Sequence, residues 1–139
     1  MTKAENLRAM YTDNGLDKED VYKHKHYVIL TRSGIEKIQA KNDIKISFKL
    51  EHIESSMAVI KATASKGDTV IETYGSASNQ NSNNNYYPEM AEKRALSRAV
   101  LKVMGYYQYG VFSSDEADEF KDADPSKGSN SKGIEVKKA

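Results

Sequence analysis

The stretch that decides the fold is NYYPEMAEKRALSRAVLKVMGYYQYG, residues 85–110. Pro88 stands where a helix would begin, strong helix formers follow, and Gly105 stands where a left-handed residue would end the helix. On a helical projection one face is apolar, formed by Leu96, Ala99, Val100, Val103 and Met104. The stretch therefore predicts a long helix that packs this face on a core.

The roughly opposite side of this helix carries basic side chains. Arg94, Arg98 and Lys102 recur four residues apart, with Ala91 and Ala95 between them. Small residues between long basic ones leave room for an extended chain to lie close, and like charges at this spacing cost a few tenths of a kcal/mol. The pattern indicates an anion-binding stripe, and an ordinary solvated helix face is the alternative interpretation.

Upstream of the long helix, the pattern is that of a small sheet with two short helices. Residues 44–53 alternate apolar and polar side chains, so one face of this strand is expected to be wet. The step Gly67-Asp68 is typical of a tight hairpin turn. The expected order is helix 3–15, strand 20–31, helix 31–43, strands 44–53, 57–65 and 68–78, a polar loop at 79–85, and the long helix. This order predicts an α+β fold with a β-α-β-β-β-α core, in which a curved antiparallel sheet carries the long helix on one face.

Composition limits the classes of protein that fit. The length of 139 residues suits one domain, which we place at 1–112 with a net charge of +3 (16 basic and 13 acidic residues). Residues 113–139 hold 5 basic and 7 acidic residues, a net −2, and predict an acidic-leaning disordered tail. The absence of a membrane-length apolar run and of a basic-then-apolar leader at Met1 predicts a soluble, cytoplasmic protein. With no cysteine, disulfides, thiolate metal sites and thiol nucleophiles are excluded.

A family resemblance gives the helix a function. A strand ending in TYGSAS (73–78), a polar loop and EMAEKRALSRAVLKVMGY (89–106) resemble the single-strand annealing protein superfamily. This superfamily includes the Erf- and Sak-type phage recombination proteins and the annealing protein of eukaryotic double-strand-break repair. The resemblance covers about residues 20–112, and the helix positions that fit the family pattern are Glu89, Ala91, Arg94, Ala95, Arg98, Ala99, Leu101, Lys102 and Gly105.

The resemblance implies a non-enzymatic protein of phage or mobile-element DNA recombination and repair. Its subunits would form a ring or filament and hold single-stranded DNA by its phosphates in a basic groove, with the bases free to pair. Basic residues of the helix contribute to that groove, which implicates Arg98 and Lys102 most directly and Arg94 with them. Further candidates come from the hairpin and the wet strand face, unless they only keep a sheet soluble: Lys45, Lys49, Lys61 and Lys66. Annealing makes and breaks no covalent bond, and phosphate contacts carry no sequence information.

Histidines, possible catalytic motifs and tyrosines are the remaining candidates for functional groups. His24 and His26, two apart in one expected strand, favour a small basic patch over a metal site completed by His52, so no metal and no cofactor is expected. No nucleophile–base pair, phosphate loop or magnesium-binding set of acids is evident, so an enzyme, including a metal-dependent nuclease, is not expected. Tyrosines cluster near the ends of the long helix. One interpretation is that they stack on bases, and the other is that they pack at the margin of the core. They are Tyr74, Tyr86, Tyr87, Tyr106, Tyr107 and Tyr109.

Two alternatives concern protein partners. The acidic run flanked by Phe112 and Phe120 is either a solvated tail or a segment that competes with DNA for the basic stripe or recruits a replication or host protein. The alternative function is a non-enzymatic phage or mobile-element interaction protein that binds a host protein through the same fold.

Overall fold

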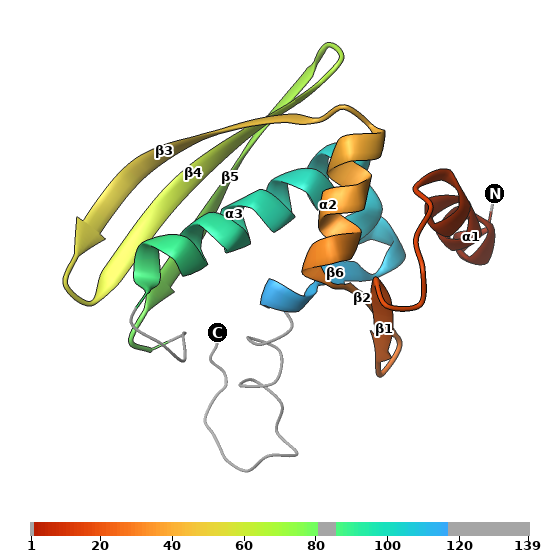
Figure 1. Ribbon diagram of the computed structural model, residues 1–139, viewed down its shortest axis with the longest axis horizontal. Helices are drawn as coiled ribbons and strands as arrows, with labels where there is room; N and C mark the ends of the chain where they lie inside the picture. Colours follow the sequence, from red (N-terminus) through yellow and green to blue (C-terminus); the bar gives the residue numbers. More distant parts are fainter. Residues whose placement is uncertain (1, 81–85, 117–139) are drawn as a thin grey trace.

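The computed structural model describes residues 2–80 and 86–116 (Figure 1). Within these residues, 114–116 are helical, and the chain before them runs through three α-helices, one 3-10 turn and six strands. In order they are α1 (Lys3–Asp13), β1 (Val21–His24), β2 (Tyr27–Leu30), α2 (Arg32–Lys41), β3 (Lys45–Glu54), β4 (Met57–Lys66), β5 (Thr69–Ser78), α3 (Tyr87–Met104), the 3-10 turn η1 (Tyr106–Tyr109) and β6 (Val111–Ser113).

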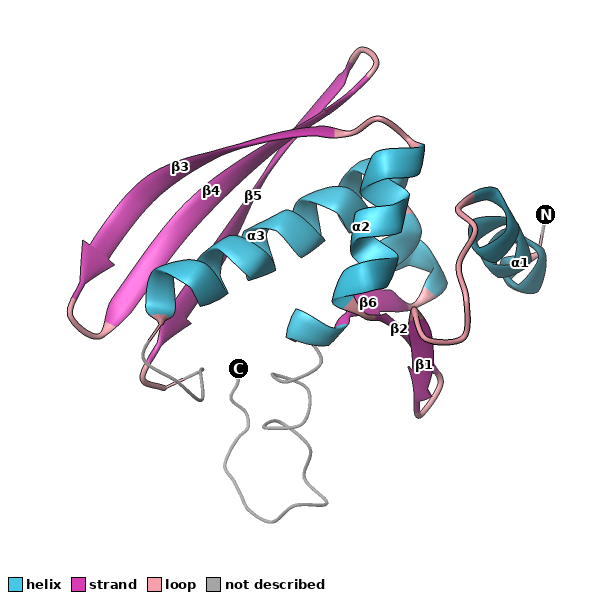
Figure 2. Cartoon of the chain, in the orientation of Figure 1, coloured by secondary structure: helices cyan, strands magenta, loops and turns pink. Residues whose placement is uncertain are grey.

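The strands form two small sheets, not one (Figure 2). In the larger sheet, β3, β4 and β5 form an antiparallel meander that curves over α3. In the smaller sheet, β2 pairs antiparallel with β1 and parallel with β6. The predicted α+β class, with a long helix on the face of a sheet, is confirmed.

The prediction of one strand over residues 20–31 was wrong, because the chain reverses in its middle. Lys25 adopts a positive φ of 59° and, with His26, forms the turn between β1 and β2. The two histidines therefore do not share one strand face: His24 ends β1 and His26 lies in the turn. The described residues contain no group of three or more His, Cys, Asp or Glu that could hold a metal ion.

A β-bulge changes which side chains of β3 share a face. The pairing of β3 with β4 shifts between Leu50 and His52, so one extra residue enters β3. His52 then pairs with Val59, while Ile53 pairs with the buried Ala58. Because strand faces alternate, the bulge moves His52 off the face that Ile46, Phe48 and Leu50 share and places Ile53 there.

Helix α3 is the centre of the molecule, with the larger sheet on one side and α2 and the smaller sheet on the other (Figure 1). Its ends follow the predicted signals, since Pro88 lies in the first turn and Gly105 ends the helix with a φ of 72°. The predicted apolar face is buried at Leu96, Ala99 and Val100. The side facing the sheet is also buried, and it contains Ala91, Arg94 and Ala95.

The helix approaches β5 most closely at Gly75. A Cβ atom added at this residue would overlap the Ala91 carbonyl oxygen and the Ala95 amide nitrogen, both backbone atoms of α3. Beside it, the Thr73 hydroxyl donates a hydrogen bond of 2.9 Å to the Ala95 carbonyl oxygen. The small side chains of α3 thus let the backbones of helix and strand meet.

Asp20 joins the loop before β1 to helix α2. Its carboxylate is 2 % exposed, accepts a hydrogen bond of 2.7 Å from the Asp17 amide and another of 2.7 Å from Lys37 Nζ, and is also bonded by the Ser33 hydroxyl. Burial by itself would raise the pKa of Asp20, but these hydrogen bonds and the Lys37 charge outweigh it and lower the pKa to about 2.

This lowered pKa predicts acid sensitivity. The unfolded chain binds a proton at Asp20 near pH 4, whereas the folded protein does so only near pH 2, so the stabilisation is present above pH 4 and is lost as the pH falls from about 4 to about 2. We expect a loss of about 1–2 kcal/mol over this range. Urea unfolding of wild type and Asp20→Asn between pH 2 and 7 measures it, with the exposed Asp17→Asn as the control. An unchanged pH dependence in Asp20→Asn would contradict the assignment.

The folded part continues beyond the boundary predicted at residue 112. Strand β6 includes Ser113, and Glu116 is buried, with 9 % of its surface exposed. The rest of the predicted disordered tail, residues 117–139, lies outside the described residues, as do residues 81–85 of the polar loop. Over the described ranges, no helix has both the length and the apolar character needed to cross a membrane.

Candidate nucleic-acid interface

The structure breaks up the basic stripe predicted on α3. Arg94 is 1 % exposed, and its Nη1 donates a hydrogen bond of 2.8 Å to the Ser76 carbonyl oxygen. The expectation that Arg94 lies on a solvent-facing stripe was therefore wrong. The space left by Ala91 and Ala95 is filled by β5 at Gly75, so the extended chain that lies close to this face belongs to the protein itself.

Arg94 and Arg98 act together on the outer edge of β5. Arg98 Nη1 donates to the Tyr74 carbonyl oxygen at 2.9 Å, two residues before the carbonyl that Arg94 reaches. Helix residues four apart rise by about 6 Å, and strand residues two apart by about 6.8 Å, so the two spacings match. The arginines thereby cover carbonyl groups that an edge strand would otherwise present to another chain.

The first two acidic residues of the predicted tail contact side chains of α3. Glu116 contacts Arg98. The Arg98 Nε atom lies 3.4 Å from Glu116 Oε2, which accepts a hydrogen bond of 2.9 Å from the Tyr107 hydroxyl. Burial, and then the Glu116 charge, raise the pKa of Tyr107 above its ordinary value. Asp115 accepts a hydrogen bond of 2.8 Å from the Ser97 hydroxyl of α3. Two acids thus lie directly against the helix.

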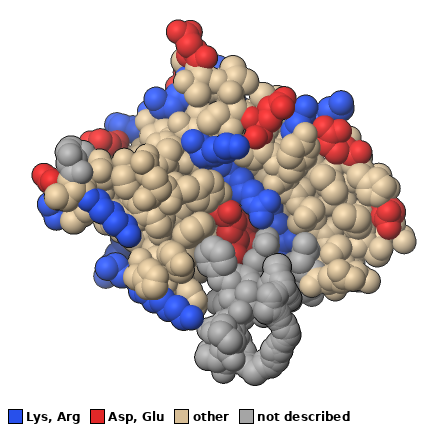
Figure 3. Space-filling view, turned by 180° about the vertical axis from the view of Figure 1, so that it is seen from behind, with Lys and Arg blue, Asp and Glu red and all other residues tan. Residues whose placement is uncertain are grey.

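Basic side chains gather on one face of the molecule. In Figure 3, Lys and Arg form a diagonal band across the middle of the face, with Asp and Glu beside it. Among the predicted helix residues, Lys102 is exposed and the Arg98 side chain is 34 % exposed. These two residues, and not Arg94, are the cations of the predicted stripe that a ligand can reach.

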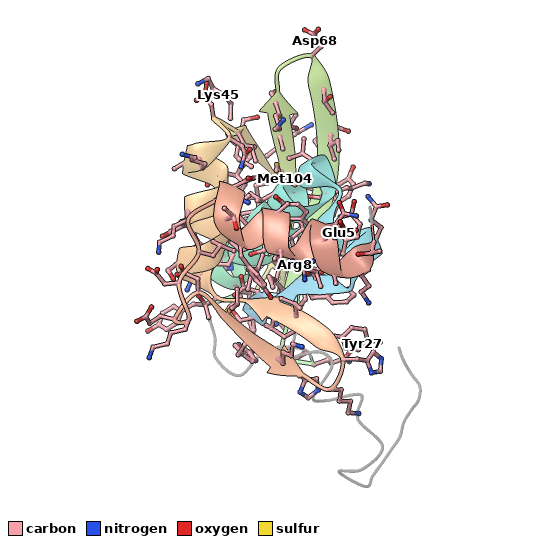
Figure 4. All side chains as sticks on the ribbon, turned by 90° about the vertical axis from the view of Figure 1, so that its right-hand side faces the viewer. Glu5, Arg8, Tyr27, Lys45, Asp68 and Met104 are labelled. Atoms are coloured by element: carbon pink, nitrogen blue, oxygen red, sulfur yellow. The ribbon has the colours of Figure 1, made fainter. Side chains whose placement is uncertain are left out.

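The larger sheet brings three of the four candidate lysines onto one face. Strand residues alternate, and Ala58, Ile60, Ala62 and Ala64 of β4 point toward α3, so Lys61 points away from it. Lys49 of β3 and Tyr74 of β5 are the direct neighbours of Lys61 across the sheet. Lys45 shares this face four residues before Lys49, at the end of the sheet near Asp68 (Figure 4). We call Lys49, Lys61 and Tyr74 the cross-sheet row.

The fourth lysine and the surrounding acids limit this surface. Lys66 is half-buried in the pair that closes the β4–β5 hairpin and by alternation faces the other side. Lys61 Nζ lies 3.3 Å from Glu72 and 3.8 Å from Glu51, and its hydrogen bond to Glu72 is the main cause that raises the pKa of Lys61. Lys45 pairs with Asp43 at 3.2 Å, where both side chains are exposed and the pair is weak.

The tyrosines separate into packed and exposed groups. Tyr87 and Tyr106 are buried, and Tyr107 and Tyr109 are half-buried against the core, as the packing interpretation predicted. Tyr74 and Tyr86 are 52 % and 68 % exposed, so their rings are accessible for stacking. Tyr74 is the one that lies beside lysines.

Gly75 is the sequence signal for the contact between helix α3 and strand β5. An isolated glycine within a strand marks close approach of another backbone. Gly75 lies in the middle of the β5 segment TVIETYGSAS, and Ala91 and Ala95 are the small partners on α3. Together these residues predict that the alanine side of α3 faces the sheet.

Comparison of the chain with protein-family models, with curated proteins and with solved structures finds no match in any of the three.

Proposed function

We propose that this protein binds single-stranded DNA through its phosphates, without sequence preference, and promotes annealing of complementary strands. The observation that carries the proposal is the cross-sheet row, where two lysines and an exposed tyrosine lie side by side on the sheet face turned away from α3. At the outer edge of β5, Arg98 of α3 bonds the backbone of the same Tyr74 and adds a cation at the margin of this face.

The row suits a single DNA strand because its lysines can bind phosphates and its tyrosine can stack on a base. Neighbouring strands of a sheet are about 4.8 Å apart, so Lys49 and Lys61 offer two cations at an interval of about one strand spacing. The Tyr74 ring offers a surface on which one base stacks, and such stacking tolerates any base. Hydroxyls of Ser47, Thr63 and Ser65 on the same face add neutral hydrogen-bond donors.

Annealing on such a face requires no catalytic group. Neutralising the phosphates removes the repulsion between two strands. Because the protein holds each strand by its backbone, the bases remain free to pair. Base pairing then supplies the driving force. The Glu51 and Glu72 carboxylates beside Lys61 oppose phosphate binding, which keeps the affinity moderate and strongly dependent on salt.

The row is tested by Lys49→Ala combined with Lys61→Ala. Loss of two phosphate contacts is expected to weaken binding to a poly-dT oligonucleotide by about tenfold at low salt and to reduce the slope of log K against log salt by about 1.4. Fluorescence anisotropy measures both quantities. Lys18→Ala, an exposed lysine in the loop between α1 and β1, is the matched control and should bind as wild type does. An unchanged affinity and slope in the double variant would reject this face as the binding site.

The alternative function, a non-enzymatic interaction protein, has one observation in its favour. Phe48, Leu50 and Ile53 of β3 are 42 %, 52 % and 53 % exposed, an apolar strip of the kind that contacts another protein. If the protein bound no DNA at low salt while variants of this strip changed its association with a protein partner, the alternative would replace the annealing proposal.

A further inference from the structure

The β3 edge is the least protected part of the larger sheet. β3 has ten residues and pairs only with β4, while α3 packs mainly on β4 and β5 (Figure 1). The side chains of Phe48 and Leu50 consequently extend beyond the helix and are 42 % and 52 % exposed. A long edge strand with exposed apolar side chains is a template for pairing with another strand.

The two edge strands of this sheet differ in how their outward-facing backbone groups are covered. Arg94 and Arg98 cover the carbonyl groups of Ser76 and Tyr74 on the β5 edge. The β3 edge has no counterpart of these arginines among the residues that the structure describes. A head-to-tail assembly, in which β3 of one copy pairs with β5 of the next, would have to displace both arginines. Pairing between two β3 edges displaces no arginine of this kind within residues 2–80 and 86–116.

The hairpins determine which backbone groups of β3 face outward. Gly67 and Asp68 form a two-residue turn, so the closing pair Lys66 and Thr69 is hydrogen-bonded and every second pair after it is bonded as well. The intervening residues of β4, including Lys61 and Thr63, therefore bond to β3. Before the bulge, their partners on β3 are the odd-numbered residues Lys45, Ser47 and Lys49. The amide and carbonyl groups of Ile46, Phe48 and Leu50 are therefore left on the free edge.

Charge and the bulge together select one register for two antiparallel β3 strands. An axis at Leu50 would place Lys49 opposite Glu51, but it would centre the new pair on the bulge between Leu50 and His52, where regular pairing is broken. A twofold axis at Phe48 places Phe48 opposite its own copy, Ile46 opposite Leu50, and Lys45 opposite Glu51 of the second copy. An axis at residue 49 would place two Lys49 side chains opposite each other, and an axis at residue 47 would place Lys45 opposite Lys49. Like charges directly opposite each other destabilise a strand pair, whereas opposite charges stabilise it.

We propose that the β3 edge binds the β3 edge of a second copy of this chain, with the twofold axis at Phe48. Outward-facing backbone groups of Ile46, Phe48 and Leu50 form the ladder, the exposed apolar side chains meet their copies, and two Lys45–Glu51 pairs close the ends. The product is a closed dimer with a six-stranded sheet, not the ring or filament that the family resemblance implies. The proposal stands independently of DNA binding, although the joined sheet would carry two cross-sheet rows on one face.

A single introduced cysteine tests the axis, because the natural chain has none. Bonded antiparallel pairs have Cα atoms about 5.5 Å apart, within the range that a disulfide spans. Mild oxidation of Phe48→Cys is expected to give a covalent dimer, while the control Val70→Cys, 63 % exposed on the other edge strand, stays largely monomeric. Sedimentation equilibrium of the wild-type protein should give twice the 15.6 kDa mass of one chain. A monomer at every concentration, or Phe48→Cys crosslinking no faster than Val70→Cys, would overturn the proposal.

Charge exchange tests the register without changing the apolar residues. Lys45→Glu and Glu51→Lys each place like charges opposite one another twice per dimer, and each is expected to weaken dimerisation by about tenfold. The double variant restores opposite charges and should recover most of the wild-type affinity. Recovery supports this register, and a double variant that is as weak as the two single changes combined would exclude it.

Discussion

Gly75→Ala is expected to lower the free energy of unfolding by about 3 kcal/mol. The added Cβ would occupy the positions of the Ala91 carbonyl oxygen and the Ala95 amide nitrogen, and backbone atoms of a helix cannot rotate away as a side chain can. Relief requires α3 to move off β5, which would break the hydrogen bond from the Thr73 hydroxyl to Ala95 and those from Arg94 and Arg98 to the strand.

Urea unfolding followed by circular dichroism measures this loss. Ser76→Ala is the matched control, because its half-exposed side chain points away from α3 and its carbonyl group is unchanged. We expect the control to stay within about 0.5 kcal/mol of wild type. Equal stabilities for Gly75→Ala and Ser76→Ala would show that helix and strand do not meet as described.

Arg94→Ala is expected to cost about 2–4 kcal/mol of stability. The substitution removes a long buried side chain, leaves a cavity between α3 and β5, and deprives the Ser76 carbonyl oxygen of its donor. Arg94→Met should cost less, about 1–2 kcal/mol, because it keeps most of the apolar stem and loses only the guanidinium.

The same substitution separates two roles for the helix arginines. Because Arg94 is buried, Arg94→Met should bind poly-dT with wild-type affinity wherever the variant is folded, whereas Lys49→Ala, at an exposed site of the cross-sheet row, should weaken binding with no loss of stability. The neighbouring exposed Lys93→Ala is a stability control. An Arg94→Met protein with unchanged unfolding and lost DNA binding would restore the original stripe hypothesis.

The ends of α3 and the strands of the larger sheet were predictable because their signals are local. Pro88 acts through its fixed φ, and Gly105 acts through its freedom to adopt a positive φ. The alternation in 44–50 reflects the two faces of a single strand. The turn at Lys25 was missed because neither Lys25 nor His26 is a typical turn residue, so the run from 20 to 31 resembled one strand.

The orientation of α3 could not be derived from its periodicity alone. A helix between two layers is buried on two sides, and a projection that contrasts one apolar face with one polar face assigns the second side to solvent. Such a projection assigns Arg94 to solvent because it is an arginine. In the structure it is buried, because its guanidinium bonds the Ser76 carbonyl oxygen of β5. The cross-sheet row could not be derived from the hairpin turns alone either. The turn between β3 and β4 by itself would place Lys49 opposite Ala62, and the bulge between Leu50 and His52 shifts it opposite Lys61.

The most direct test of the central claim is fluorescence anisotropy of the wild-type protein with a labelled poly-dT oligonucleotide at two salt concentrations. The account predicts binding at low salt that weakens steeply as salt rises, because each phosphate contact releases a counterion. Complementary strands should then anneal faster in the presence of the protein. Absence of binding at low salt would contradict the proposed function, and binding with no dependence on salt would contradict the phosphate contacts of Lys49, Lys61 and Arg98.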